Sequence, residues 1–244
     1  MDVLRLHDCD RHHLNIPDPE ILVPDVVRRT RALARDAPDR YVFIPHSYDA
    51  IELGRTIDAI VEFRRTPTSK QSELIYEFNS DYLSTPSIEN ISLQELHDFY
   101  NSLMEQIDNY FFQGALMQGP TPHLRLVMID EPHLNIQGFW GPVRHIASRL
   151  RLVARNSSTG KRRSKLDLLT TLVHELAHAY IGVFFNFCPD LRQAPLVLLN
   201  DGHGETWRQI YNGIVIHMRT WHPSLLGLGV RVDDFAGGTF VTRY

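Results

Sequence analysis

The chain is poor in cysteine. Cys9 and Cys188 are the only two among 244 residues. A structural zinc site is closed by four cysteine or histidine ligands, so these two distant cysteines exclude a cysteine-rich zinc ribbon or finger. A chain of this length can bury its own core, so we expect free thiols in a reducing compartment. A Cys9–Cys188 disulfide is the alternative.

Long apolar runs are absent as well. No stretch approaches the roughly 18 apolar residues that a membrane-spanning helix needs. Charged residues interrupt the apolar ones in Met1–Asn15, which excludes the apolar segment of a secretory signal. We therefore expect an intracellular protein, in the nucleus or the cytoplasm, with no membrane partner.

The chain also lacks net positive charge. Its formal net charge is −4 at pH 7, so it has no overall attraction for nucleic acid, and binding would need a local basic cluster. Such a cluster occurs at Lys161, Arg162, Arg163 and Lys165, beside a flexible loop expected at Asn156–Gly160. We treat these four basic residues as candidate phosphate contacts on DNA. A solvated hairpin or connector is the alternative.

The most informative pattern is His-Glu-Leu-Ala-His at residues 174–178. Residues i and i+4 of a helix lie on the same face, so His174 and His178 can bind one metal ion. Glu175 can then act on a water molecule bound to that ion, which is the arrangement of a zinc hydrolase. His203 lies between two glycines at the start of an expected helix and is the best candidate for the third ligand.

The residues around this pattern help to distinguish a metal site from a chance match to a short motif. Apolar residues recur at helical spacing through Lys165–Phe185, which predicts a long and well-buried helix. A buried His-Glu-His cluster without a metal would be costly to desolvate. Binding of one catalytic Zn²⁺ therefore explains these residues better than core packing does.

Three segments together resemble one family. His-Glu-Leu-Ala-His-Ala at 174–179, Asp-Gly-His-Gly at 201–204 and Trp207 are similar to the motifs of the SprT-like zinc metalloproteases, which include the Spartan group acting on DNA–protein crosslinks. The resemblance covers about Ser92–Thr220. It implies Glu175 as general base and three zinc ligands: His174, His178 and His203.

The sequence also departs from related patterns. The metzincin motif would need a glycine and a histidine where Ile181 and Phe184 stand, which excludes that family. Asn186–Leu199 reads as an inserted loop between the second and third ligands. Many SprT-like proteins carry a cysteine-rich zinc element after the catalytic core, and this chain has no cysteines for one.

These observations lead to one main hypothesis and two alternatives. The main one is a zinc-dependent endopeptidase in which Glu175 activates a zinc-bound water against a peptide bond. The resemblance implies a protein substrate that is associated with DNA and a role in crosslink repair. The first alternative is a zinc-stabilised chromatin- or DNA-binding module without turnover. The second is a zinc hydrolase that acts on nucleic acid.

Glu205 is a candidate for a hydrogen bond to a ligand histidine.

The first part of the chain, residues 1–90, is expected to be a mainly helical extension. Its amphipathic patterns predict helices over Asp25–Asp36 and Tyr48–Arg65. Between them and the next helix, Thr66–Pro86 is polar and contains prolines, so we expect a loop or a domain edge there.

Residues 91–220 are expected to form the SprT-like domain, followed by a tail or capping segment over 221–244. Ser92 and Glu95 have the spacing of a capping box and should start a helix. Strand patterns then occur at three places: Leu124–Ile129, Gly138–Val143 and Ile146–Val153. Helix, three-stranded sheet, motif helix and third-ligand helix make an α+β fold, and the resemblance implies a zincin-like core.

Ile146–Val153 is the candidate for an edge strand beside the cleft. It alternates apolar residues with Arg149 and Arg151, as a half-exposed strand does. An edge strand can pair with an extended peptide substrate. A half-exposed strand without a substrate role is the alternative.

Overall fold

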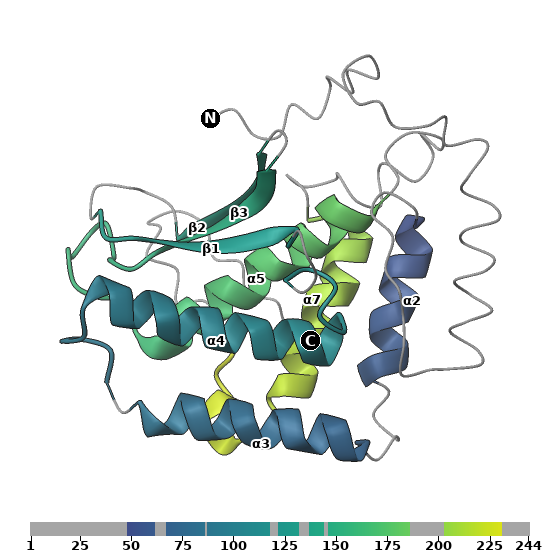
Figure 1. The fold of residues 1–244 in the computed structure, drawn as a ribbon, viewed down its shortest axis with the longest axis horizontal. Helices are drawn as coiled ribbons and strands as arrows, with labels where there is room; N and C mark the ends of the chain where they lie inside the picture. Colours follow the sequence, from purple (N-terminus) through teal and green to yellow (C-terminus); the bar gives the residue numbers. More distant parts are fainter. Residues whose placement is uncertain are drawn as a thin grey trace.

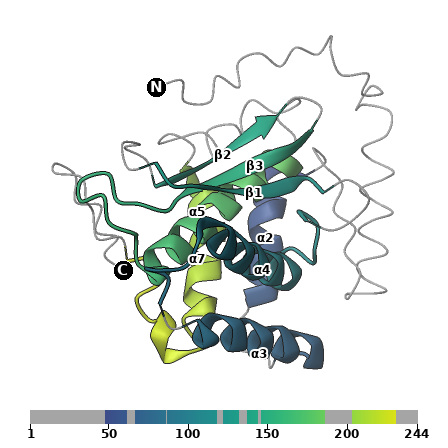
Figure 2. The same ribbon diagram turned by 60° about the vertical axis from the view of Figure 1, so that its left-hand side comes forward.

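The computed structural model describes residues 48–61, 67–85, 87–117, 122–131, 137–143, 146–185 and 203–230. The helix expected over Asp25–Asp36, the inserted loop at Asn186–Leu199 and both cysteines lie outside these ranges. The described part has mixed helices and strands, as the α+β expectation requires. In both ribbon views the helices lie on one side of the sheet (Figures 1 and 2).

The described helices are, in chain order, α2 (Ala50–Val61), α3 (Ser69–Ser84), α4 (Leu93–Phe111), α5 (Lys165–Phe184), α7 (Glu205–Met218) and the short 3₁₀ helix η1 (Pro223–Leu225). The expected helix over Tyr48–Arg65 is thus confirmed as α2 within the described residues, and 62–65 lie outside them. None of the described helices is both long enough and apolar enough to cross a membrane.

The expectation of a loop over Thr66–Pro86 is wrong, because α3 fills most of it. Thr68 and Gln71 form a capping box at its start, in which the Thr68 hydroxyl accepts the Gln71 N–H. Phe78 and Tyr82, one turn apart, are buried on one face. The polar composition belongs to the remaining, solvent-facing side of an amphipathic helix.

The start of α4 follows the expected capping box. Glu95 N–H donates to Ser92 Oγ at 3.2 Å, and Ser92 N–H donates to Glu95 Oε2 at 2.7 Å. These two bonds satisfy backbone donors that have no partner within the helix. The buried face of α4 includes Leu96, Tyr100, Leu103 and Ile107.

The sheet has three strands in the order β1-β3-β2. They are β1 (Leu124–Ile129), β2 (Gly138–Val143) and β3 (Ile146–Val153), with the bounds expected from the sequence. β1 is parallel to β3, and β2 is antiparallel to it. β3 is therefore the central strand, so the expectation that Ile146–Val153 is the edge strand is wrong. The edges of the described sheet are β1 and β2.

One hydrophobic core joins the sheet to the helices. The sheet contributes Leu124, Leu126, Leu150 and Leu152, whose side chains are buried on the helical side. α4 packs against β1, and α5 packs against β2 and β3. α2 contacts α7 and α5, and α3 contacts α4.

The described part of the expected N-terminal extension shares this core. Leu53 and Ile57 of α2 and Phe78 of α3 are fully buried in the same cluster as α5. At the other end of the chain, residues 221–230 form a turn that contains η1. Trp221 of this turn contacts Phe78 edge to face, with ring centroids 5.1 Å apart.

The helix that carries the histidine motif is surrounded by protein. α5 begins after Ser164, whose hydroxyl accepts the Asp167 N–H, and it ends within one residue of the expected boundary. Buried residues lie on several of its faces, because the sheet, α7 and α2 all contact it. A helix held on so many sides is a rigid support for ligands.

Candidate metal centre

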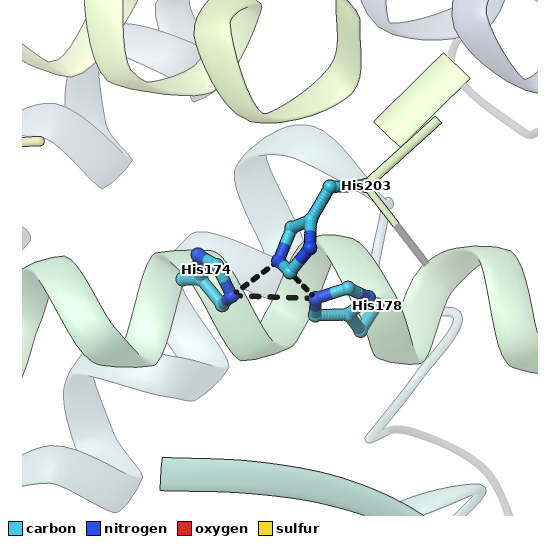
Figure 3. Close-up of side chains that lie close together, drawn as sticks. All are labelled: His174, His178 and His203. Atoms are coloured by element: carbon cyan, nitrogen blue, oxygen red, sulfur yellow. Dashed lines mark hydrogen bonds between the residues drawn. The ribbon is translucent and has the colours of Figure 1, made fainter. Parts of the chain in front are cut away.

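Three histidine side chains meet between α5 and α7. His174 and His178 project from the same face of α5, and His203 approaches from the residue pair that precedes α7 (Figure 3). The Nε2 of His203 lies 3.0 Å from that of His174 and 3.2 Å from that of His178, and the latter two lie 3.3 Å apart. The three predicted ligands are thus brought together.

The donor set fits a metal ion. In a tetrahedral zinc site with Zn–N distances of about 2.0–2.1 Å, two ligand nitrogens lie roughly 3.3 Å apart. The three Nε2 atoms are close to that spacing. Three neutral imidazoles cannot all be satisfied by hydrogen bonds to one another, whereas one cation accepts a lone pair from each. These histidines are close enough to bind a single metal ion.

The backbone before α7 presents the third histidine. Gly204 is the N-cap of α7 and has extended backbone angles, and no side chain caps the helix. His203 is therefore placed by the start of α7, whose helical pattern the sequence predicts.

Two aromatic residues of α7 form a wall behind the histidines. The Trp207 ring stacks on His178, with centroids 5.2 Å apart, and meets His203 edge to face at 4.4 Å. Tyr211 stacks on Trp207 at 4.8 Å. Sequence reasoning used Trp207 only as a family motif and missed Tyr211. Their spacing of one helical turn was the signal that could have found the pair.

Glu175 is buried beside the cluster, with only 6% of its surface exposed. Its Oε1 lies 4.0 Å from Nε2 of His174. Its Oε2 accepts the backbone N–H of Trp140, in β2, at 2.9 Å. The two carboxylate oxygens thus have different surroundings, one facing the histidines and one held by the edge strand. Sequence reasoning missed the contribution of Trp140.

Glu205 lies in the first turn of α7 and is exposed. In the described part of the chain its carboxylate forms no hydrogen bond with His174, His178 or His203. A negative charge in the first turn of a helix is favourable next to the unpaired N–H groups there. The structure does not bring Glu205 to the ligands, and helix electrostatics explain its position.

The basic stretch before α5 forms a closed hairpin, which is the alternative to a phosphate-contacting loop. Arg155 and Arg162 face each other across it, and the turn is closed by Gly160 N–H donating to the Asn156 carbonyl at 2.8 Å. Arg155 Nη2 donates to Asp130 Oδ2 at 3.3 Å, and Asp130 Oδ1 forms ion pairs with Arg155 Nε at 2.8 Å and with Arg162 Nη1 at 3.8 Å. Arg162 is therefore engaged within the protein.

The other candidate phosphate contacts divide into two kinds. Arg163 is buried, with 7% of its surface exposed. Lys165 Nζ donates to the carbonyls of Tyr82 and Thr85 at the end of α3 and lies 4.3 Å from the Tyr82 ring centre. Burial lowers the pKa of Lys165. Of the four candidates Lys161 alone is exposed, and a DNA contact stays a prediction there.

Comparison of the chain with models of protein families, with curated proteins and with solved structures gave no match. What supports a function is therefore the site itself and the motifs that form it.

Proposed function

We propose that the protein is a zinc-dependent endopeptidase with a SprT-like catalytic site. The observation that carries the proposal is the meeting of His174, His178 and His203 at one point with the buried carboxylate of Glu175 beside them. Three histidines leave a fourth zinc position open, as catalytic sites do. A purely structural site has no use for the carboxylate.

Each protein group has a role in this proposal. Zinc, when bound, would lower the pKa of a water molecule and polarise the peptide carbonyl. Glu175 would accept a proton from a water molecule there through Oε1, the oxygen that faces the histidines. Trp140 N–H keeps the other oxygen in place, which orients the base. The aromatic wall of Trp207 and Tyr211 limits the movement of the imidazole rings.

The arrangement around α5 supports a zincin-like core. The sheet packs on the motif helix, and its antiparallel edge strand β2 runs beside Glu175. Within the described residues β2 pairs only with β3, so the backbone groups on its other edge, apart from the Trp140 N–H that donates to Glu175, can pair with an extended peptide. We assign the substrate-binding edge to β2, in place of Ile146–Val153.

Action on DNA-associated proteins is a further part of the proposal, and it rests on the family resemblance. The basic stretch gives it little support, because Arg162, Arg163 and Lys165 contact the protein itself. A nuclear location and a role in crosslink repair are proposed on the same ground. The alternative of a zinc-stabilised binding module without turnover is an outcome of the experiment below.

Replacing Glu175 with glutamine tests the mechanism. Glutamine keeps the size of the side chain and an oxygen for the Trp140 N–H, but it cannot accept the proton. We expect bound zinc to be retained and kcat to fall by roughly 10²–10⁴-fold. Zinc content and cleavage of casein and of a basic DNA-binding protein are measured, with and without single- and double-stranded DNA.

Glu205→Gln is the matched control, because Glu205 is exposed and makes no hydrogen bond with the ligand histidines within the described residues. It should cleave as the native chain does. Full activity of Glu175→Gln would contradict the mechanism. A native chain that binds zinc and cleaves none of the substrates would support the binding module.

A further inference from the structure

Trp140 contacts α5 in two ways. Its backbone N–H donates to Glu175 Oε2 at 2.9 Å. Its ring lies against Gly182, where an added Cβ would fall 2.0 Å from Cη2 and 2.6 Å from Cζ2 and Cζ3. Glu175 and Gly182 are about two helical turns apart, so both contacts lie on one face of α5.

A second glycine allows the same close approach from the side of the strand. A Cβ on Gly138 of β2 would fall 2.7 Å from Thr171 Cγ2, 2.8 Å from the Arg151 carbonyl oxygen and 3.3 Å from Glu175 Cγ. A glycine in a strand is typical where another element comes unusually near. β2 and α5 are thus in direct contact because each has a glycine where the other approaches.

The hydrogen bond to Glu175 depends on where β2 lies. β2 pairs with β3 on one side, and the Trp140 N–H reaches Glu175 from the strand at the edge of the described sheet. If β2 moved outward by about 1 Å, this bond would be lost, since hydrogen bonds weaken steeply beyond about 3.2 Å. The fit of the Trp140 ring on Gly182 fixes that separation.

We propose that Trp140 is a positioning residue for the general base: its ring, packed on Gly182, sets the position of β2 and so of the N–H that holds Glu175. The contact itself is independent of any activity. Its catalytic consequence rests on the proposed function.

The contact is tested by hydrogen exchange of the residue 140 amide in the full chain. Glu175→Ala removes the acceptor, Gly182→Ala places a methyl group against the ring, and Trp140→Leu removes the ring. Each should speed exchange of this amide by about tenfold or more. Gly213→Ala is the control, because it also adds a methyl group to a helix but not beside β2. Its Cβ would lie 3.2 Å from Ile57 Cγ2, where α7 packs on α2.

The catalytic consequence is tested by kinetics on protein with measured zinc content. Gly182→Ala should lower kcat by at least about tenfold with little change in KM, because a small misplacement of a catalytic group is costly. Adding Trp140→Leu to Gly182→Ala should restore part of kcat, since leucine lacks the ring atoms that the new methyl group would strike. Gly213→Ala should keep the native kcat.

Two results would overturn the proposal. One is native exchange at residue 140 in a folded, zinc-loaded Gly182→Ala protein. The other is a double variant no faster than Gly182→Ala alone. If Gly182→Ala does not fold, exchange in Trp140→Leu decides, and native protection there counts against the proposal. If the native chain shows no Glu175-dependent cleavage, the proposed function fails, and the exchange experiment still tests the contact.

Discussion

The histidine cluster and the basic stretch lie within a few tens of residues of each other in the sequence. In the fold, the histidines come together at one site, but the basic residues do not. His174, His178 and His203 turn their Nε2 atoms toward one point. Of the four basic side chains only Lys161 is exposed, whereas Arg162 approaches Asp130, Arg163 is buried and Lys165 caps α3. Helical spacing predicts which side chains will lie on the same face, whereas a run of charged residues does not predict where its side chains point.

The difference has a physical cause. The positions of His174 and His178 follow from the helix alone, because residues four apart share a face. No comparable rule fixes the direction of four basic residues that cross from a hairpin into a helix. Their directions depend on tertiary partners, because helix C-termini and carboxylates attract cations, as phosphates do.

The largest expected effect comes from removing the third ligand. His203→Ala should weaken zinc affinity by at least roughly 100-fold, since even residues that only support ligands cost 10–100-fold when they are changed. Competition with a coloured chelator measures the affinity. His97→Ala is the control, because His97 contacts Asp98 and the Leu126 carbonyl on α4 and β1. Unchanged zinc affinity in His203→Ala would mean that the three histidines do not act together.

An intermediate effect is expected at Lys165, and it concerns stability. Lys165→Met keeps most of the apolar stem and removes the donor to the Tyr82 and Thr85 carbonyls. Hydrogen bonds from charged groups are worth roughly 1.5–3 kcal/mol, and partial exposure reduces this, so we expect a loss of about 1–2 kcal/mol in the free energy of unfolding. Urea unfolding measures it, with zinc content unchanged. Native stability with weakened DNA binding would instead make Lys165 a phosphate contact.

The sequence predicted what depends on local rules. The helix around His174, the capping box at Ser92 and all three strands follow from short-range pattern. The errors concern tertiary order. The pattern of Ile146–Val153 does not predict that β1 will pair with the edge opposite β2 and so make β3 the central strand.

The same limit explains what was missed around the site. α3 looked like a loop because its buried face is narrow and its other faces are polar. The hydrogen bond from Trp140 to Glu175 joins residues on different elements through a backbone N–H, which no side-chain motif can indicate. The sequence therefore predicts the three histidines that meet, but it does not predict the backbone contact that positions Glu175.

The smallest effect is expected at Lys161, the one exposed member of the basic cluster. Its backbone closes the hairpin, since the Asn156 N–H donates to its carbonyl, and this contact survives a change of side chain. Lys161→Met should therefore keep the free energy of unfolding within about 0.5 kcal/mol and leave zinc content and cleavage unchanged. The informative measurement is the salt dependence of DNA binding. A single phosphate contact lowers the slope of log affinity against log salt by about one, and several lower it more. A native slope would remove the last candidate contact of the basic stretch, whereas a drop well above one would show that the hairpin opens to bind DNA and that its internal ion pairs are exchanged for phosphates.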